Sequence, residues 1–251
     1  TILRLIIGLQ KPTSGSIWIH GEDITQYTEE EMDEVRRQMG MVFQYSALFD
    51  SMTVGENVAF GPRQRTKYTE DKIQAIVKDK LHLVGLDGIE QMMPNDLSGG
   101  MKKRVSLARA IALDPKVILY DEPTAGLDVS AREELLDMLR EYMEPGDRSI
   151  LISSHIATDL EGFCDDIYLI HDGKIVLHED TDVLLGKYGV LKVTEEQYWK
   201  IDRKYIIAVR KEEYGYRCLT NEKQFYLENY PDIVIEKSGI DELILMEKKE
   251  K

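Results

Sequence analysis

The sequence contains few cysteines, only Cys164 and Cys218, and they lie far apart in the chain. Neither has a second candidate ligand nearby, so they form neither a disulfide framework nor a zinc-binding pattern. This scarcity favours a reducing compartment over an oxidising one.

Long hydrophobic runs are also missing. No apolar run approaches the roughly 18 residues that cross a membrane, and no signal peptide is visible in the sequence. If the protein works at a membrane, we expect another chain to supply the span.

The chain has no excess of basic residues. It carries 46 acidic and 32 basic side chains, which gives a formal net charge of −14. Broad nucleic-acid binding needs a basic face, so we expect no nucleic-acid partner.

What the sequence does contain is a set of apolar segments that alternate with helical ones. Residues 40–44, 116–122 and 149–154 predict buried strands, and residues 166–177 predict one further strand. Strands that alternate with helices, several of them uniformly apolar, indicate an α/β fold with a mostly parallel sheet covered on both faces.

The composition changes beyond about Gly189, where Tyr, Lys and Glu become frequent. Residues 204–212 and 216–220 read as strands, and residues 241–251 read as a final helix. We therefore predict a main domain over residues 1–188 and a small C-terminal α+β appendage over residues 189–251.

The sharpest chemical signal is the segment VILYDEP (117–123). A buried strand delivers Asp121 and Glu122 at its C-terminal end, where α/β sheets place ligands. The first carboxylate can hold Mg²⁺ and the second can polarise an attacking water, which suits phosphoryl chemistry. A strand that ends in a polar turn would explain the same residues.

A second signal lies about 20 residues upstream, in LSGGMKKR (97–104). Ser98, Gly99 and Gly100 precede a helix, so bare backbone N–H groups and the positive helix end form an anion site. A glycine-rich helix cap is the simpler alternative for this motif alone. The basic run at 102–104 can likewise be a solvated helix face.

His155 follows the strand predicted at 149–154. A lone histidine after a strand is more often structural than catalytic. Its neighbour Ser154 does not make a hydrolytic triad, because no nucleophile-elbow motif is present.

Taken together and in this order, these elements resemble the nucleotide-binding subunit of ATP-binding cassette (ABC) transporters, over about residues 1–185. The resemblance implies a fold of the P-loop NTPase type with a helical signature subdomain at about residues 45–110. The matching elements are Gln44 of the Q-loop, Leu97 to Gly100 of the signature motif (with Met101 where glutamine is commoner), Asp121 and Glu122 of Walker B, Ala125 to Asp128 of the D-loop, and the switch histidine His155.

The resemblance also implies roles for these residues. Glu122, His155 and Gln44 would take part in ATP hydrolysis, and Asp121 and Gln44 would hold Mg²⁺. The nucleotide would contact Thr1, Ser98, Gly99, Gly100 and Asp128.

The family's glycine-rich phosphate loop has no counterpart in residues 1–251. Thr1 resembles the last residue of that loop, so we expect the loop, its lysine and the adenine-stacking aromatic residue to lie upstream in a longer protein. We accordingly expect the chain as given to be inactive as an ATPase.

In this family two such subunits face head to tail and sandwich two ATP molecules. The resemblance therefore implies a second nucleotide-binding subunit and a transmembrane permease as partners, with the chain lying peripherally on the cytoplasmic face of a bacterial membrane. Apolar residues after Gln44, such as Leu48, Phe49 and Met52, would form a groove for a membrane partner or pack in the core.

The subfamily stays open. Residues 48–60 and 97–128 look most like lipid-transport ATPases, whereas residues 149–220 look more like exporters of drugs and antibiotics. A soluble ABC-type ATPase that acts on DNA or ribosomes, and a non-catalytic interaction protein, are the alternatives. Long heptad insertions, which the DNA-repair members carry, are absent here, and an intact Glu122 and His155 argue against a degenerate site.

Overall fold

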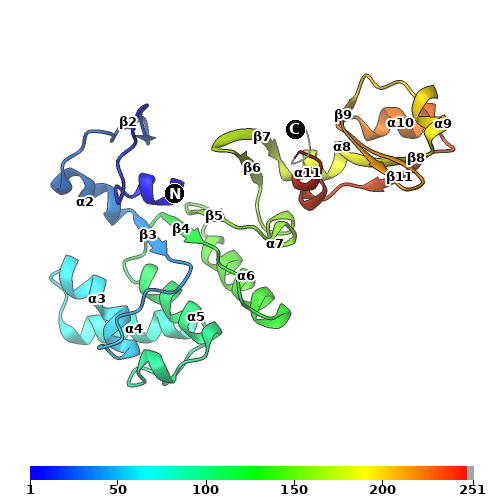
Figure 1. The fold of residues 1–251 in the computed structure, drawn as a ribbon. Coiled ribbons are helices and arrows are strands. Elements are labelled where there is room, and N and C mark those ends of the chain that lie inside the picture. Colours follow the sequence, from blue (N-terminus) through cyan, green and yellow to red (C-terminus); the bar gives the residue numbers. More distant parts are fainter. Residues whose placement is uncertain (248–251) are drawn as a thin grey trace. The chain divides into compact units, whose positions relative to one another are not determined.

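The chain forms two compact units, which Figure 1 shows in the computed structural model. The structure describes residues 1–247. The first unit covers residues 1–155 and the second begins at Ile156. The domain boundary that the sequence predicts, after residue 188, does not coincide with this division.

The first unit is built on a parallel sheet of three strands in the order β3-β4-β5. The strands are β3 (Met39–Val42), β4 (Val117–Asp121) and β5 (Ser149–Ser153). Ile118, Leu119 and Tyr120 of the central strand are at most 1% exposed. The prediction of parallel pairing is confirmed for these three segments. Burial is confirmed for the middle of β4, whereas no residue of β5 is buried and Leu151 is 40% exposed.

Two further elements of the first unit lie near its beginning. Helix α1 (Ile2–Ile6) packs Leu3 and Ile7 against Leu119 of β4. Strands β1 (Trp18–Ile19) and β2 (Glu22–Asp23) form a short antiparallel hairpin, and α2 (Glu29–Arg37) follows it.

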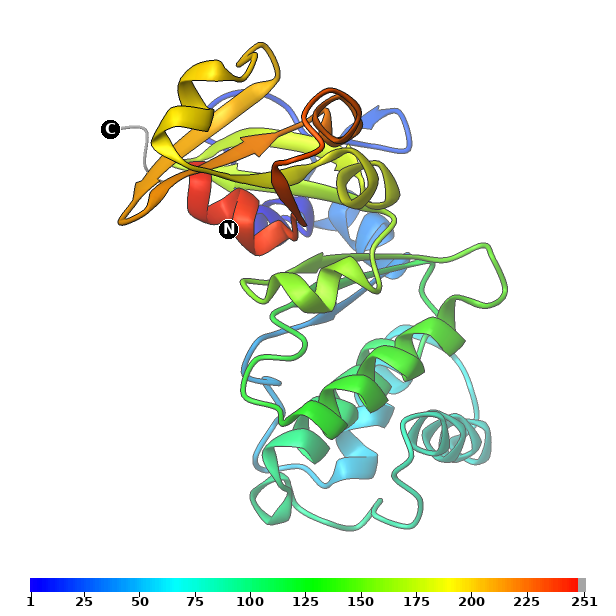
Figure 2. The same cartoon turned by 90° about the vertical axis from the view of Figure 1, so that its right-hand side faces the viewer.

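Helices make up the middle of the first unit. Helices α3 (Val54–Arg65), α4 (Glu70–Leu83) and α5 (Gly99–Ala110) pack on one another, and the one-turn helix η1 (Pro94–Asp96) precedes α5. They lie together in the lower part of Figure 2. All of them fall within the range predicted for the helical subdomain. Helix α6 (Val129–Met143) connects β4 to β5.

A buried asparagine on α3 fixes the loop that precedes this helix. The Asn57 side chain is fully buried. Its Oδ1 accepts from the Phe49 backbone N–H at 2.8 Å, and its Nδ2 donates to the carbonyls of Phe49, Met52 and Thr53 at 3.0 to 3.1 Å. One side chain therefore satisfies four backbone groups of residues 49–53.

Replacing Asn57 by leucine is expected to lower the free energy of unfolding by about 3 kcal/mol, because buried backbone groups lose their partners. Chemical denaturation followed by circular dichroism measures the change. The exposed Asn95 supplies the control, since Asn95→Leu should stay within about 0.5 kcal/mol of the parent. Equal stability of the Asn57 variant and the parent would contradict this role.

The second unit begins with α7 (Ala157–Glu161), β6 (Asp166–His171), β7 (Lys174–Asp180) and α8 (Thr181–Lys187). Strands β6 and β7 form an antiparallel hairpin, so the prediction of one strand over residues 166–177 is wrong. Asp172 and Gly173 both have positive φ angles, 46° and 74°. An Asp-Gly pair at this position is the usual signal for a two-residue hairpin turn.

A four-stranded antiparallel sheet in the order β11-β8-β10-β9 forms the rest of the second unit. The strands predicted at 204–212 and 216–220 are confirmed as β9 and β10. Helix α11 begins at Ile240, and the predicted helix residues 248–251 lie outside the described residues. The bounds are β8 (Gly189–Val193), α9 (Glu195–Lys200), β9 (Ile206–Glu212), β10 (Gly215–Thr220), α10 (Lys223–Asn229), β11 (Val234–Lys237) and α11 (Ile240–Glu247).

One hydrophobic core joins both halves of the second unit. Ala157 of α7 belongs to the same cluster as Leu184 of α8 and as Ile240 and Leu243 of α11. The Glu161 carboxylate also accepts a hydrogen bond from the Ile240 backbone N–H at 2.5 Å. Residues after 189 therefore complete a core that starts directly after His155.

Both cysteines are free thiols in this second unit. Cys218 is fully buried, and burial raises the pKa of its thiol to about 12. Burial, with a smaller contribution from Asp165, raises the pKa of the Cys164 thiol to about 11.

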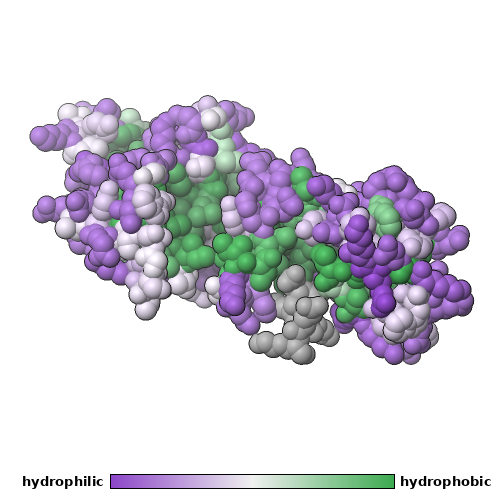
Figure 3. Space-filling model, turned by 90° about the horizontal axis from the view of Figure 1, so that it is seen from above, coloured by the Kyte–Doolittle hydropathy of each residue, from purple (hydrophilic) through white to green (hydrophobic). Residues whose placement is uncertain are grey.

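The surface is mainly hydrophilic, with patches of hydrophobic residues that appear green in Figure 3. No helix within residues 1–247 is long and apolar enough to cross a membrane.

Candidate functional site

The carboxyl ends of the three parallel strands bring the predicted residues to one edge of the sheet. Asp121 is the last residue of β4, and Glu122 follows it. His155 lies two residues beyond β5, and Gln44 lies two residues beyond β3. Because parallel strands end at the same edge, residues from three segments that are far apart in sequence share one region.

Asp121 is fixed by the neighbouring strand. Its Oδ1 accepts a hydrogen bond from the Ser153 hydroxyl at 2.6 Å, and the Glu122 backbone N–H donates to the Ser153 carbonyl at 2.8 Å. The end of β5 therefore sets the backbone of both carboxylate residues. Sequence reasoning did not select Ser153.

Glu122 and His155 form a close pair. Glu122 Oε2 lies 2.7 Å from His155 Nδ1, and the His155 backbone N–H donates to the same oxygen at 3.4 Å. The Glu122 side chain is 18% exposed, whereas that of His155 is 70% exposed. The imidazole thus holds the carboxylate on one side and faces solvent with its other ring nitrogen.

Glu122 has a φ of +50°, in the left-handed region that non-glycine residues seldom adopt. Such backbone strain persists only where the surrounding structure holds it, and it clusters at functional sites.

Lys103 of α5 supplies part of that support. Its Nζ donates to the carbonyls of Glu122 at 2.9 Å and of Pro123 at 2.7 Å, and the residue is only 8% exposed. Burial lowers the pKa of the Lys103 ammonium, and the charge of Glu122 opposes that shift. The solvated-face interpretation of residues 102–104 is therefore wrong for Lys103.

The same helix also holds the segment that follows Gln44. Ser46 and Ala47 have φ angles of +63° and +45°. The Ser46 carbonyl accepts from the Ser106 hydroxyl and from Arg109, both at 2.9 Å, and the Ala47 carbonyl accepts from Arg109 at 2.7 Å. Sequence reasoning missed these donors, although polar residues three apart at 103, 106 and 109 among buried apolar ones were a visible signal.

The signature residues lie at the start of α5. Ser98 is the N-cap, and its hydroxyl accepts from the Met101 backbone N–H at 3.2 Å. A Cβ built on Gly99 would meet no atom within 4 Å, and one on Gly100 would meet only Leu127 at 3.8 Å. The two glycines therefore leave room for a ligand beside the start of α5, as an anion site at a helix N-terminus requires.

The two remaining predicted residues have capping positions. Asp128 is the N-cap of α6, where its Oδ1 accepts from the Ala131 backbone N–H at 2.9 Å. Thr1 precedes α1, is exposed, and makes no side-chain hydrogen bond to the first turn of that helix. These contacts leave the roles of Asp128 and Thr1 towards a nucleotide as predictions.

The oxygen atoms at the sheet edge suit Mg²⁺. Within residues 1–247 no three potential ligands from His, Cys, Asp and Glu gather into a cluster. Mg²⁺ in phosphoryl-transfer sites is commonly held by one or two carboxylates together with phosphates and water, rather than by an all-protein cage. Asp121, with one carboxylate oxygen hydrogen-bonded to Ser153, fits that arrangement.

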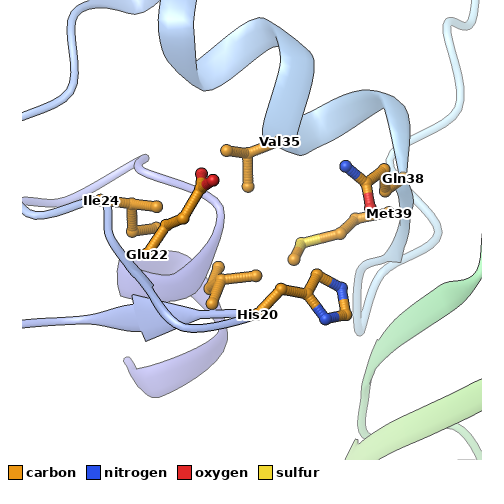
Figure 4. A pocket seen from close by; sticks show the side chains of 7 residues that line it. His20, Glu22, Ile24, Val35, Gln38 and Met39 are labelled. Atoms are coloured by element: carbon orange, nitrogen blue, oxygen red, sulfur yellow. The ribbon is translucent and has the colours of Figure 1, made fainter.

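A pocket of about 380 Å³ lies elsewhere in the first unit. Figure 4 shows its side chains between α2 and the β1–β2 hairpin, His20, Glu22 and Met39 among them. Met39 begins β3, whereas Gln44 follows its end, so this pocket lies at the amino end of the strand. Ligands of α/β sheets bind at the carboxyl ends, which makes the motif edge the better candidate.

Comparison with known proteins agrees with this geometry. A family model described as "ABC transporter" matches residues 1–125. The ATP-binding protein MlaF of the intermembrane phospholipid transport system of Haemophilus influenzae is 40% identical over 185 residues, which cover 74% of this chain and 70% of that protein. The methionine import ATP-binding protein MetN of Carboxydothermus hydrogenoformans is 39% identical over 189 residues, 75% of this chain and 56% of MetN.

Solved structures give the same result. The dimeric post-hydrolysis state of the ATP-binding cassette MJ0796, bound to ADP and phosphate, matches with a TM-score of 0.67 and 28% identity over 72% of this chain and 79% of that one. The protein cbiO1 of Clostridium perfringens, part of the ABC transporter complex cbiONQ, matches with a TM-score of 0.65 and 30% identity over 72% of each chain. The chain, with its parallel sheet, signature helix and paired Glu122 and His155, belongs to the family of ABC transporter ATP-binding subunits.

Proposed function

We propose that this chain is the ATP-binding and ATP-hydrolysing part of an ABC transporter, and that residues 1–188 form its catalytic domain. The observation that carries the proposal is the Glu122 carboxylate, held 2.7 Å from His155 beside Asp121 at the carboxyl end of a parallel sheet. Family members are ATPases, and all the residues of the family motifs lie within residues 1–188.

Each residue has a distinct part in this proposal. Glu122 orients the attacking water and accepts its proton, because its carboxylate is mostly buried but reachable. His155 holds that carboxylate through Nδ1 and offers its exposed ring edge to the γ-phosphate. Gln44 contacts the γ-phosphate and couples its presence to the conformation of residues 45–53. Mg²⁺ held by Asp121 and Gln44 would neutralise charge on the phosphates.

The signature motif acts on a second nucleotide. The open first turn of α5 at Ser98, Gly99 and Gly100 would receive the γ-phosphate of an ATP held by another nucleotide-binding subunit. ATP then joins two subunits head to tail and hydrolysis releases them. Asp128 would contribute to the same interface.

The partner in the membrane would be a permease, with this chain lying peripherally on the cytoplasmic face. The rings of Phe49 and Phe60 are tilted against each other with centroids 4.8 Å apart, and both residues are at least 36% exposed, which supports a docking surface there. The two relatives named above are described as phospholipid-transport and methionine-import proteins, so neither cargo nor direction follows from them.

Residues 1–251 are expected to hydrolyse ATP negligibly, because the nest of N–H groups and the lysine of the phosphate loop are not among them. A fusion that places the loop segment of the Haemophilus relative before Thr1 should gain ATPase activity. Phosphate release with Mg-ATP measures both. A fusion that binds Mg-ATP tightly but never turns over would contradict the proposed function.

Ser98→Arg in that fusion is expected to reduce ATP hydrolysis by roughly 100-fold or more, because a transition-state contact is lost, while monomer affinity for ATP stays within about twofold. The guanidinium would block closure over the partner's nucleotide and leave the subunit's own site intact. Calorimetry at low protein concentration measures the affinity. A large loss of affinity would mean that Ser98 serves its own chain.

A further inference from the structure

Lys103 of α5 is buried, and its ammonium donates to two backbone carbonyls of the segment that carries Glu122. Its Nζ donates to the Glu122 and Pro123 carbonyls at 2.9 and 2.7 Å. Arg104, the next residue, pairs with Glu134 instead. An ammonium is costly to bury, so these two hydrogen bonds are a specific arrangement rather than a consequence of composition.

Lys103 binds the Glu122–Pro123 peptide, and the geometry of this peptide determines where the Glu122 side chain lies. Glu122 has a φ of +50°, and its amide is held from the other side by the Ser153 carbonyl at 2.8 Å. Its carboxylate reaches His155 Nδ1 from that backbone. A rotation of the Glu122–Pro123 peptide would move the carboxylate away from both His155 and the end of β4.

We propose that Lys103 is a positioning residue that holds the strained Glu122 backbone, and so the Glu122–His155 pair, from the helix that carries the signature motif. The expected effect on kcat rests on the proposed function, whereas the expected effect on the Glu122–His155 contact does not. Lys103 lies five residues after Ser98, in the second turn of the same helix. A single helix therefore links the anion site at its start to the backbone of the hydrolytic carboxylate.

Three variants separate positioning from general support of the fold. Lys103→Met keeps the length of the side chain and removes both donors. Lys103→Gln keeps one amide donor group without the charge. Lys102→Met removes the same charge from the neighbouring position, which is more exposed than Lys103 and has no contact with Glu122.

The first measurement uses residues 1–251 without nucleotide. Nitrogen and carbon resonances of the His155 ring, followed by NMR at constant pH, report the Glu122–His155 contact. Lys103→Met should shift them, Lys103→Gln should return them towards the parent positions, and Lys102→Met should leave them unchanged. Unchanged His155 resonances in a folded Lys103→Met protein would overturn the proposal.

The second measurement uses the fusion that carries a phosphate loop. Lys103→Met should lower kcat about 10-fold or more, since misplacing a catalytic group by even 1 Å has effects of that size, with KM for ATP within about twofold. Lys102→Met should change neither constant by more than about twofold. Equal losses of kcat in both lysine variants would overturn the proposal.

A failure of the proposed ATPase function and a failure of the proposal for Lys103 give different results in the two measurements. An inactive parent fusion would contradict the ATPase function and leave the His155 resonances to decide the role of Lys103. If Lys103→Met does not fold, Lys103→Gln carries the test, and parent-like His155 resonances and kcat are then expected to within about threefold. A folded Lys103→Gln protein that has lost the Glu122–His155 contact would show that one donor is not enough, and would support positioning by both hydrogen bonds of Lys103.

Discussion

Glu122→Gln in a fusion that carries the phosphate loop is expected to lower the rate of ATP hydrolysis by about 10²- to 10⁴-fold, the usual contribution of a general base. The amide cannot accept a proton from the attacking water, whereas Asp121 and the signature residues are unchanged. ATP should therefore remain bound and hold two subunits together. Phosphate release gives the rate, and size-exclusion chromatography with Mg-ATP gives the dimer.

Glu133→Gln is the matched control, because Glu133 is an exposed carboxylate in α6. It should retain parental turnover and show no trapped dimer. A Glu122→Gln protein that binds ATP but stays monomeric would contradict the head-to-tail arrangement. One that keeps parental turnover would remove Glu122 from the chemistry.

Deleting residues 190–251 is expected to abolish cooperative unfolding of the segment after His155. The sequence suggests that this appendage is dispensable for chemistry, because none of the family motifs falls in it. The structure shows that the deletion also removes core residues, since Ala157 and Leu184 share their hydrophobic core with Val190, Leu219 and Leu243. Residues 156–189 should therefore lose stability. Calorimetry and binding of a hydrophobic dye to the truncated chain measure the effect.

A point variant tests the same core without a truncation. Leu243 is 2% exposed, so Leu243→Asp buries a charge and should destabilise the second unit by about 3 kcal/mol or more. Asp241→Asn changes an exposed residue of the same helix and should have little effect. A truncated chain that melts cooperatively and keeps its ATPase activity in the fusion would instead support an independent appendage.

The elements that could be predicted from the sequence are those determined by local patterns. The apolar run before Asp121 gives β4, and Thr28 with Glu31 gives the capping box that begins α2. The carboxyl-end rule for parallel strands then brings Gln44, Asp121 and His155 to one edge. Each of these inferences needs only neighbouring residues and a general property of sheets.

The features that the sequence did not reveal depend on contacts between distant residues. The spacing of residues 103, 106 and 109 places Lys103 on one helix face, but its partners are two carbonyls 19 and 20 residues away, which no local pattern identifies. The positive φ of Glu122 is likewise sustained by Ser153 and Lys103 rather than by its own neighbours. The turn at Asp172 and Gly173 is different, since the Asp-Gly dipeptide is itself a local signal for a two-residue hairpin turn.

The hydrogen bond between Glu161 and the Ile240 backbone N–H has a consequence for how the protein is made. The two residues are 79 positions apart, and Ala157 shares its core with Ile240 and Leu243. During synthesis the chain emerges from its amino end at about 5–20 residues per second. The apolar side chains of the segment that follows His155 therefore lack their packing partners for several seconds, until α11 has left the ribosome.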